Sequence, residues 1–427
     1  MGRVSEMKKT KYLPLIVLLY TNFIFQGMAA IIISQNMGIF EMQWGASISQ
    51  ITLVISAIGL GRILSLNLAG FISDLVGRKF TVMVGIIAYI IFFIGILWSQ
   101  SYLIAIVMAI FAGVGNAFLD TSTYPTVMEA FPDDNDSNAL SVLNKAFIST
   151  GQFILPIATR FLLGNGHYYG WTFIVCMICL AINLVVVFFL EFPSRTISVE
   201  IHQLDEGEAS SLQFKELGSK LLVEGIALFA FSFVSVSLFN VFIMWVPLYA
   251  ERYAGVASND SLIFVSIYSL CSFISVFLTS FVVKKGVNVP KLMWWCCILT
   301  GISIAFMLVM PSMVSIILAS VFVGVFAAGG IWQLGLSVLL EFFPYRKGSV
   351  TSNYSLATSF SVMVSPYLTG LLAEHSLSYV FIYVAVLAAI GSWALSIVSK
   401  RYGEVFPETV NPNNHQLTAS LSAKKIN

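Results

Sequence analysis

Charged residues are scarce in this chain of 427 residues. Asp, Glu, Lys and Arg make up 10% of it and hydrophobic residues 58%, whereas a soluble domain carries about 25% charged residues. This composition excludes a soluble globular architecture. Cysteine and histidine are also sparse, at five and four residues, and the sequence contains no metal-ligand cluster, nucleophile elbow or phosphate-binding loop. We therefore predict neither an enzyme nor an ATP-driven pump, and no metal or organic cofactor.

Long apolar stretches separate the few charges. A hydrocarbon layer about 30 Å thick is crossed by about 20 apolar residues of helix, and twelve stretches of the chain meet this requirement. They lie near residues 13–34, 48–71, 80–98, 103–128, 141–163, 170–191, 221–249, 259–283, 290–310, 313–339, 349–373 and 378–398. The sequence thus predicts an all-α integral membrane protein with twelve transmembrane helices.

Basic residues are distributed unevenly between the two ends of these stretches. Lys and Arg stay preferentially on the cytoplasmic side of short loops, and nearly all of the 22 basic residues, Lys145 among them, precede the first stretch or fall in every second gap after it. The exceptions are Arg62, Arg160 and Arg252. Both termini are therefore predicted to be cytoplasmic, in a plasma membrane that we expect to be a bacterial inner membrane. A net charge of only +1 gives no basic field for nucleic acid.

The two halves of the chain resemble one another. The fourth stretch closes with MEAFP at 128–132 and the tenth with LEFFP at 340–344, about half a chain later, and the fifth and eleventh both open with Ser-Val and reach a proline. Such a repeat predicts two pseudo-symmetric six-helix bundles, with a substrate site between them near the midplane. The predicted parts are bundles at 1–191 and 221–401, a cytoplasmic linker at 192–220 and a disordered cytoplasmic tail at 402–427.

The most specific local motif follows the second stretch, where residues 70–79 read GFISDLVGRK. Its defining positions are Gly70, Asp74, Gly77, Arg78 and Lys79. The glycines permit close helix approach and a tight turn, Asp74 can accept bonds from a neighbouring helix N-terminus, and the two basic residues suit anionic head groups.

This motif resembles the G-x-x-x-D-x-x-G-R-K loop of the major facilitator superfamily, at its expected place after the second helix. Chain length, topology and the internal repeat agree with the resemblance over most of the sequence. The resemblance implies the fold of that superfamily and transport by alternating access. It also implies that Asp74 and Arg78 help to latch the two halves together on the cytoplasmic side.

Two ionisable residues, Arg62 and Asp120, fall clearly within apolar stretches. Each is costly in hydrocarbon unless it is paired or hydrated. Arg62 precedes Asp74 by about 18 Å of helix and Asp120 precedes Asp133 by about 20 Å, so both lie at a similar depth. We expect them to pair, with Arg62 holding Asp120 ionised until a proton or an anionic group competes. The alternative is a permanent ion pair that only fixes helix register.

The residues around Asp120 narrow the resemblance. The run FLDTSTYPTV at 118–127 looks like the fourth-helix segment of the fucose–galactose–glucose proton symporters, and ALSVLNKAF at 139–147 resembles the opening of their fifth helix. This resemblance implies that Asp120 takes part in proton coupling and favours a sugar-like solute. Two departures distinguish the chain: Tyr124 replaces an asparagine of that group, and the first stretch lacks the aspartate of the fucose symporter.

The predicted fold arranges the first, fourth, seventh and tenth stretches around a central cavity. Amides can hydrogen-bond a solute and tryptophans can cover its apolar face, although amides also bridge transmembrane helices. The candidate cavity residues are Asn22, Gln26, Asn116, Asn144, Asn240, Trp245, Trp332, Gln333 and Asn353. The adjacent Gly329 and Gly330 indicate a bend or a close approach in the tenth stretch.

These features together predict a monomeric secondary active transporter with a small-molecule substrate, the lipid bilayer as its surroundings and the proton as coupling ion. A sugar-like substrate is favoured. Arg62 equally permits a carboxylate-bearing solute, hence an organic-anion transporter, and an aromatic cavity permits proton-coupled efflux of drugs or metabolites. From another class, a non-transporting membrane receptor would use the same scaffold.

Overall fold

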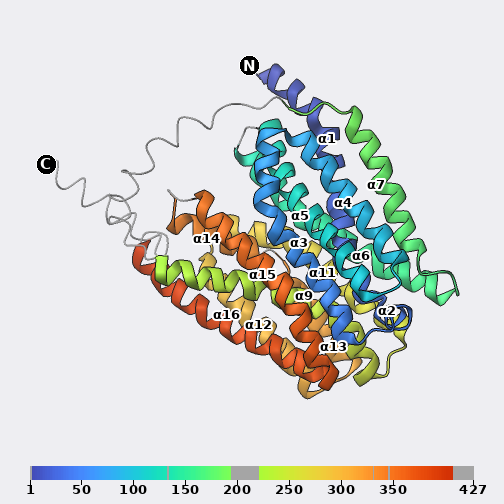
Figure 1. The fold of residues 1–427 in the computed structure, drawn as a ribbon. Coiled ribbons are helices and arrows are strands. Elements are labelled where there is room, and N and C mark those ends of the chain that lie inside the picture. The colour runs from blue at the N-terminus through green and yellow to red at the C-terminus, as the bar shows by residue number, and fades with distance from the viewer. Residues whose placement is uncertain (1, 132–133, 194–220, 330, 345–346, 407–427) are drawn as a thin grey trace.

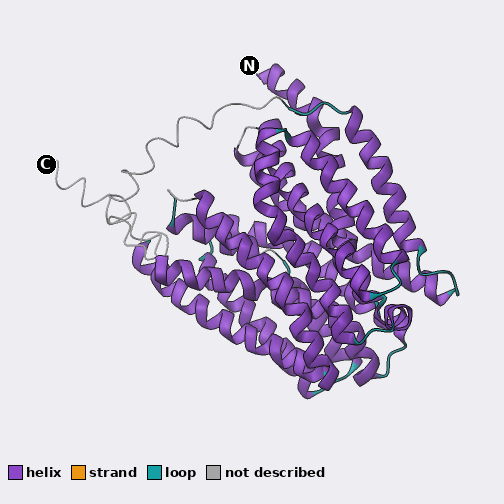
Figure 2. Cartoon of the chain, in the orientation of Figure 1, coloured by secondary structure: helices purple, strands orange, loops and turns teal. Residues whose placement is uncertain are grey.

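Long helices form the whole body of the computed structural model (Figure 1), which describes residues 2–131, 134–193, 221–329, 331–344 and 347–406. Twelve helical segments in these ranges are long and apolar enough to cross a membrane. The same ranges contain no strand (Figure 2). The prediction of an all-α protein with twelve spanning helices is confirmed.

The first half supplies six of the spanning helices. In chain order its elements are α1 (Gly2–Gln35), the short α2 (Met37–Trp44), α3 (Ile48–Leu75), α4 (Arg78–Trp98), α5 (Tyr102–Ala130), α6 (Asp134–Gly164) and α7 (Trp171–Phe189). Two serines in the loops start their helices by local hydrogen bonding. The Ser47 side chain accepts from the Gln50 backbone N–H, and that of Ser101 accepts from Ile104, as helix N-caps do. Apart from α2, the predicted stretches agree with these helices to within about four residues, except that α1 and α6 begin well before residues 13 and 141, at Gly2 and Asp134.

The second half repeats the plan. Its elements are a π-helical turn (Leu221–Gly225), α9 (Ile226–Ala254), the short α10 (Ser258–Ser261), α11 (Ile263–Lys284), α12 (Val289–Val309), α13 (Met313–Phe322), α14 (Ile331–Phe342), α15 (Lys347–His375) and α16 (Leu377–Val405). The last helix continues past the predicted start of the tail at 402, because Tyr402 packs inward and donates a hydrogen bond to Glu341. That boundary is corrected to Val405. The predicted linker from 194 and the tail from 407 lie outside the described residues.

The tenth spanning segment is broken in its middle. A π-helical turn (Val323–Ala327) separates α13 from α14, and the backbone around it is satisfied by hydroxyls of α11. Ser275 donates to the carbonyl of Val325 at 2.6 Å, and Thr279 donates to the carbonyl of Gly329 at 2.7 Å. Irregular backbone at membrane depth requires such partners. The predicted bend is confirmed at Gly329, while residue 330 lies outside the described ranges.

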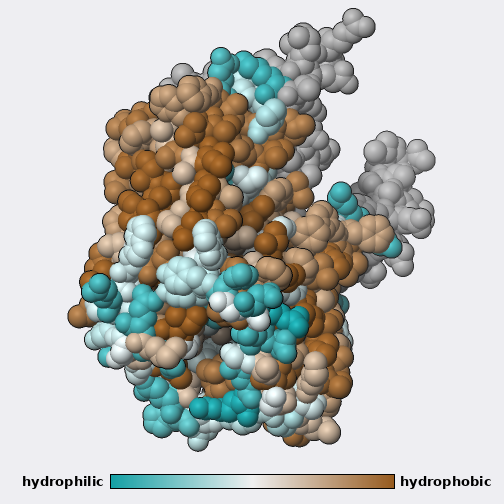
Figure 3. Space-filling model, turned by 90° about the vertical axis from the view of Figure 1, so that its right-hand side faces the viewer, coloured by the Kyte–Doolittle hydropathy of each residue, from teal (hydrophilic) through white to brown (hydrophobic). Residues whose placement is uncertain are grey.

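Apolar side chains cover much of the outer surface. On α7 an exposed stripe repeats every three or four residues, and it consists of Val175, Ile178, Ile182, Val185 and Phe189. A helix that presents such a stripe to the outside is suited to lipid rather than water. On the face shown in Figure 3, hydrophobic residues cover most of the upper surface and hydrophilic residues gather at the lower end. This distribution agrees with the predicted membrane location.

The two halves diverge toward the side on which α1 begins and α16 ends, at the upper left of Figure 1. We call this the terminal side and the other the opposite side. Toward the opposite side, α3 packs directly on α15. A Cβ atom at Gly59 would collide with the backbone of Met363, and the backbone N–H of Tyr367 donates to the Ser56 hydroxyl at 3.0 Å.

A second contact between the halves joins α6 to the α10–α11 segment. The hydroxyls of Ser149 and Ser272 share a hydrogen bond at 3.0 Å. Nearer the opposite side, Arg160 and Asp260 form an ion pair at 2.8 Å. The α3–α15 and α6–α11 pairs therefore close the molecule on the opposite side.

Within the first half, α3 and α5 approach each other closely through small residues. A Cβ atom at Gly113 would meet the carbonyl oxygen of Ile58 and lie 2.5 Å from the backbone nitrogen of Arg62. At Gly61 a Cβ atom would meet the backbone of Ile110. Small residues at such crossings let transmembrane helices pack backbone to backbone.

We predict that Gly113→Ala lowers the free energy of unfolding by about 1–3 kcal/mol, the usual cost of overpacking a close contact. The matched control is Gly38→Ala on α2, where nothing lies within 4 Å of the added carbon. Thermal unfolding of the detergent-solubilised variants measures both. Equal midpoints for the two variants would contradict the close α3–α5 packing.

Candidate functional site

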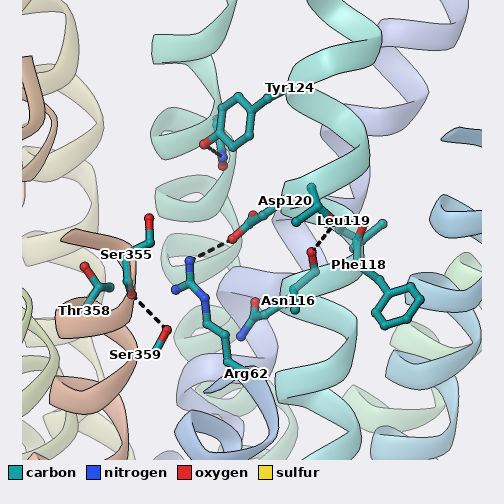
Figure 4. Close-up of polar contacts among 12 residues, drawn as sticks. Arg62, Asn116, Phe118, Leu119, Asp120, Tyr124, Ser355, Thr358 and Ser359 are labelled. Carbon is teal, nitrogen blue, oxygen red and sulfur yellow. Dashed lines mark hydrogen bonds and ion pairs between the residues drawn. The ribbon is translucent and has the colours of Figure 1, made fainter. Parts of the chain in front are cut away.

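An ion pair between the two closely packed helices occupies the middle of the first half. Nη2 of Arg62, on α3, lies 3.0 Å from Oδ2 of Asp120, on α5, and each side chain is 16% exposed. Figure 4 shows the two side chains pointing toward one another. The predicted pairing is confirmed. Because neither charge is fully buried, both remain accessible to a solute or a proton.

A third helix and a neighbouring amide surround this pair. Gln26 of α1 lies beside the Asp120 carboxylate. One turn before Asp120, Asn116 accepts a hydrogen bond from the Tyr89 hydroxyl at 2.6 Å. Gln26 Oε1 and Arg62 Nε are buried and have no hydrogen-bond partner among the described residues. The site therefore keeps one acceptor and one donor available beside its two charges.

Two serines of the second half, Ser355 and Ser359 on α15, lie on the side of α15 that is nearer to Arg62 (Figure 4). The Thr358 side chain lies on the other side of that helix, where it accepts a hydrogen bond from the Trp332 indole at 2.7 Å. Arg62 therefore lies between Asp120 in one half and hydroxyls in the other.

A cleft of about 530 Å³ runs between the halves toward the terminal side. It separates α3 and α5 from α14 and α15 and opens to the outside. Its lining residues are Leu66, Asn67, Gly70, Thr121, Leu340, Gly348, Thr351, Ser352 and Ser355. Thr121 follows Asp120 directly, so the ion pair lies beside the inner part of this cleft. A volume of this order fits a small solute.

The predicted cavity residues divide into three groups. Gln26 and Asn116 lie at the ion pair, as described. Asn144 also belongs to this polar region, because its amide donates a hydrogen bond to the Tyr124 hydroxyl, one turn from Asp120. Trp332 is half-buried, and its indole bonds within the second half, to Thr358. The three side chains in the polar region around the ion pair thus come from α1, α5 and α6 of the first half.

Asn22 and Trp245 are corrected to packing residues. Both are fully buried. The Asn22 side-chain oxygen accepts a hydrogen bond from Asn183 of α7 at 2.9 Å, and the Trp245 indole donates to Thr369 of α15 at 2.9 Å. Each bond stays within one half. A lone amide or tryptophan does not reveal from sequence which face of its helix meets a neighbour.

The remaining cavity candidates are Asn240, Gln333 and Asn353. Asn240 and Gln333 are half-buried. Asn353 is exposed and does not line the cleft. A role for these three in binding stays a prediction.

The loop motif after α3 forms a polar cluster within the first half. Arg78 donates to the side chains of Asp74 at 2.8 Å and Ser73 at 2.7 Å, and it pairs with Glu129 of α5 at 3.2 Å. Gly77 has φ of 116°, which confirms the predicted tight turn because other residues rarely adopt positive φ. These bonds tie α3, α4 and α5 together.

Two positions of the motif differ from the prediction. The Lys79 ammonium donates to the carbonyls of Phe188 at 2.7 Å and Leu190 at 3.1 Å. It thus caps the C-terminal end of α7, where a cation is favourable, instead of meeting lipid head groups. Gly70 makes no close helix approach: nothing lies within 4 Å of a Cβ atom built there, because this residue lines the cleft.

Lys145 is a charged residue that sequence reasoning misplaced. We assigned it to a cytoplasmic gap, but it lies in the spanning part of α6, and its ammonium is 4.3 Å from the ring centroid of Phe239 on α9. The signal was present, since Lys145 falls inside the predicted stretch 141–163. The basic-residue count favoured the loop because lysine is unusual in a span.

Comparison with known proteins places the chain in a family. The model of the Major Facilitator Superfamily matches residues 15–287 and 254–424. The inner membrane transport protein YdiM of Escherichia coli is 31% identical over 386 residues, which cover 90% of this chain and 93% of the relative. The MFS-type transporter YfkL of Bacillus subtilis is 33% identical over 386 residues, covering 90% and 95%.

Solved structures agree on the fold. The xylose transporter XylE of E. coli, in a partially occluded inward open conformation, superimposes with a TM-score of 0.70 at 13% identity, covering 93% of this chain and 99% of that one. The nucleoside transporter NupG gives a TM-score of 0.70 at 12% identity, covering 92% and 99%. At these identities the likeness concerns architecture alone.

We predict that Arg62 and Asp120 are energetically coupled. Arg62→Gln or Asp120→Asn alone leaves a partly buried charge without its partner and should lower stability by about 1–3 kcal/mol. The double variant removes both charges and should cost less than the sum of the two. Thermal unfolding of the four proteins gives a coupling energy, expected at about 0.5–3 kcal/mol. Strict additivity would show that the ion pair contributes nothing.

Proposed function

The chain belongs to the major facilitator superfamily, a family of membrane transporters and not of enzymes, and on this premise we propose that it couples movement of a small polar solute to movement of a proton. The observation that carries the proposal is the Arg62–Asp120 pair. It is the one ion pair of the described residues that lies deep between the helix ends and beside the cleft. A titratable carboxylate there can bind a proton that arrives through the cleft.

The arrangement of the halves supports transport by alternating access. Contacts such as Ser56–Tyr367 and Arg160–Asp260 join the halves toward the opposite side, while the cleft opens toward the terminal side. Transport requires these contacts to separate and the cleft to close. The excess of basic residues on the terminal side supports a cytoplasmic location for it, in a plasma membrane, which makes this conformation open to the cytoplasm.

Competition for Arg62 couples the two movements. While Asp120 is ionised, the guanidinium is paired with it. A solute that draws the guanidinium toward α15 leaves the carboxylate in a region of low polarity, where the charged form is unfavourable. Asp120 then takes up a proton. Release of the solute returns Arg62 to Asp120 and expels the proton, so that neither ligand completes the cycle alone.

The walls of the cleft suit a solute with several hydrogen-bonding groups. Thr121 contributes a hydroxyl from the first half, and Thr351, Ser352 and Ser355 contribute hydroxyls from the second. A hydroxylated, sugar-like solute agrees with this lining. A carboxylate-bearing solute agrees with the available donors of Arg62, and the choice between the two depends on further charges near the site.

We predict that Asp120→Asn abolishes solute-driven proton movement, because an amide cannot release or bind the proton. A screen of purified protein against sugars, organic acids and drugs by thermal shift first identifies a solute. Proteoliposomes with an internal pH-sensitive dye then report proton flux when this solute is added. The control is Glu41→Gln, the same chemical change on α2 and outside the spanning helices. Coupled proton flux undiminished in Asp120→Asn would refute the coupling role.

We also predict that Gly70→Leu blocks transport while leaving the folded protein intact. The added side chain enters the open cleft, where nothing lies within 4 Å of its Cβ. It would meet α15 only when the cleft closes. Gly59 and Met363 form such a close contact between the halves on the opposite side. Solute flux should fall at least tenfold, because a tight steric contact raises the barrier to closure. The unfolding midpoint should be unchanged. Gly38→Leu is the control, and flux unchanged in Gly70→Leu would contradict closure at this point.

A further inference from the structure

Lys145 carries a positive charge that the Arg62–Asp120 pair does not use. Its ammonium lies over the ring of Phe239 at 4.3 Å and makes no ion pair with any described residue. Asp120 is already engaged by Arg62. A ring face offsets only part of the cost of removing an ammonium group from water.

The depth of Lys145 matches that of the ion pair. About 28 Å of helix separates Lys145 from the end of α6 at Gly164, and about 27 Å separates Asp120 from the start of α5 at Tyr102, taking about 1.5 Å per residue. Both distances are measured from the opposite side. Lys145 and Asp120 therefore lie at similar distances from the opposite side, so that this part of the first half holds two cations, Arg62 and Lys145, and one carboxylate.

Lys145 also lies on the face of α6 that meets the second half. Ser149 and Phe153 follow it at successive turns of the same face, and both contact α11: Ser149 through the Ser272 hydroxyl and Phe153 through its carbonyl, which accepts from Ser266. One turn closer to the terminal side, Lys145 meets α9 instead. The ammonium is thus placed between the halves, where their relative movement changes its surroundings.

Polar side chains connect Lys145 to Asp120. Tyr124 lies one turn from Asp120 on α5, and its hydroxyl accepts a hydrogen bond from Asn144, the residue before Lys145. The Asn144 oxygen is buried and has no partner among the described residues. A solute that reaches from the ion pair to Lys145 would therefore meet a free acceptor on the way.

We propose that Lys145 binds the anionic group of the transported solute, and that this solute is a small hydroxylated carboxylate. The inference rests on the proposed transport function and narrows its substrate class. The carboxylate would neutralise Lys145 between the halves, while the hydroxyl groups would bond to Ser355 and Thr121 along the cleft. An excess cation in a region of low polarity selects an anion over a neutral sugar of the same size.

Lys285 provides a matched control for the contact itself. Its ammonium lies 4.4 Å from the ring centroid of Phe281, nearly the same geometry as at Lys145. It is exposed at the terminal end of α11, where water hydrates it. The two lysines differ in surroundings and not in the kind of contact.

The test measures binding to the full chain in lipid nanodiscs by thermal shift, with acids and their neutral counterparts: glucuronate with glucose, glycerate with glycerol, and benzoate with benzyl alcohol. Glycerol phosphate separates phosphate from carboxylate recognition. At least one hydroxylated carboxylate should bind the wild type at least tenfold more tightly than its neutral counterpart. Lys145→Gln should weaken this binding at least tenfold, Lys145→Arg should restore it in part, and Lys285→Gln should leave it unchanged.

Unfolding midpoints measured without solute distinguish a role of Lys145 in binding from a role in packing. Because Lys145→Gln removes an uncompensated charge, its unfolding midpoint should equal or exceed that of the wild type. A lowered midpoint together with unchanged acid affinity would show that the lysine serves packing, and would overturn the proposal. Stabilisation by neutral solutes or glycerol phosphate alone, or by no acid of the set, would also overturn it.

These results are distinguishable from a failure of the proposed function. The readout is binding, which needs no proton movement. Acid binding that depends on Lys145 but drives no proton flux would retain this inference and remove the coupling proposal. Proton flux driven by a neutral solute and undiminished in Lys145→Gln would retain the coupling proposal and remove this inference.

Discussion

Charge in a region of low polarity must be compensated, and the Arg62–Asp120 pair is the point at which this protein meets that constraint. Gly61 and Gly113 let α3 and α5 approach closely enough for the guanidinium to reach the carboxylate. The pair lies beside Gln26 of α1 and borders the cleft between the halves. A change in its protonation or its partners therefore acts on three helices of one half and on the surface that the other half closes against.

Much of the architecture could be predicted from sequence, because the bilayer imposes a simple rule. Twelve apolar stretches became twelve spanning helices, and the depth of Arg62 and Asp120 along their helices was sufficient to predict that they pair. Side-chain direction was harder. Asn22 and Trp245 face neighbouring helices, and no single residue reports which face of its helix is buried. Lys145 was misplaced because the positive-inside rule assigns lysines to loops.

The halves share a plan but differ in their chemistry. In the first half Glu129 pairs with Arg78, whereas its counterpart Glu341 accepts a hydrogen bond from Tyr402. The central charges Arg62, Asp120 and Lys145 all belong to the first half. The second half contributes hydroxyls, the Phe239 ring and the broken α13–α14 segment. Recognition of charge and adaptation of the cavity walls are thus divided between the two bundles.

The central claim is that protonation of Asp120 biases the cleft between open and closed. Spin labels at Leu75→Cys and Gly348→Cys, at the terminal-side ends of α3 and α15, measure the separation of the halves by double electron–electron resonance once the five native cysteines are replaced. The distance distribution of the wild type should shift between alkaline and acidic pH. In Asp120→Asn the distance distribution should resemble that of the acidic wild type at both pH values. A pH-dependent shift that persists in Asp120→Asn would contradict the account.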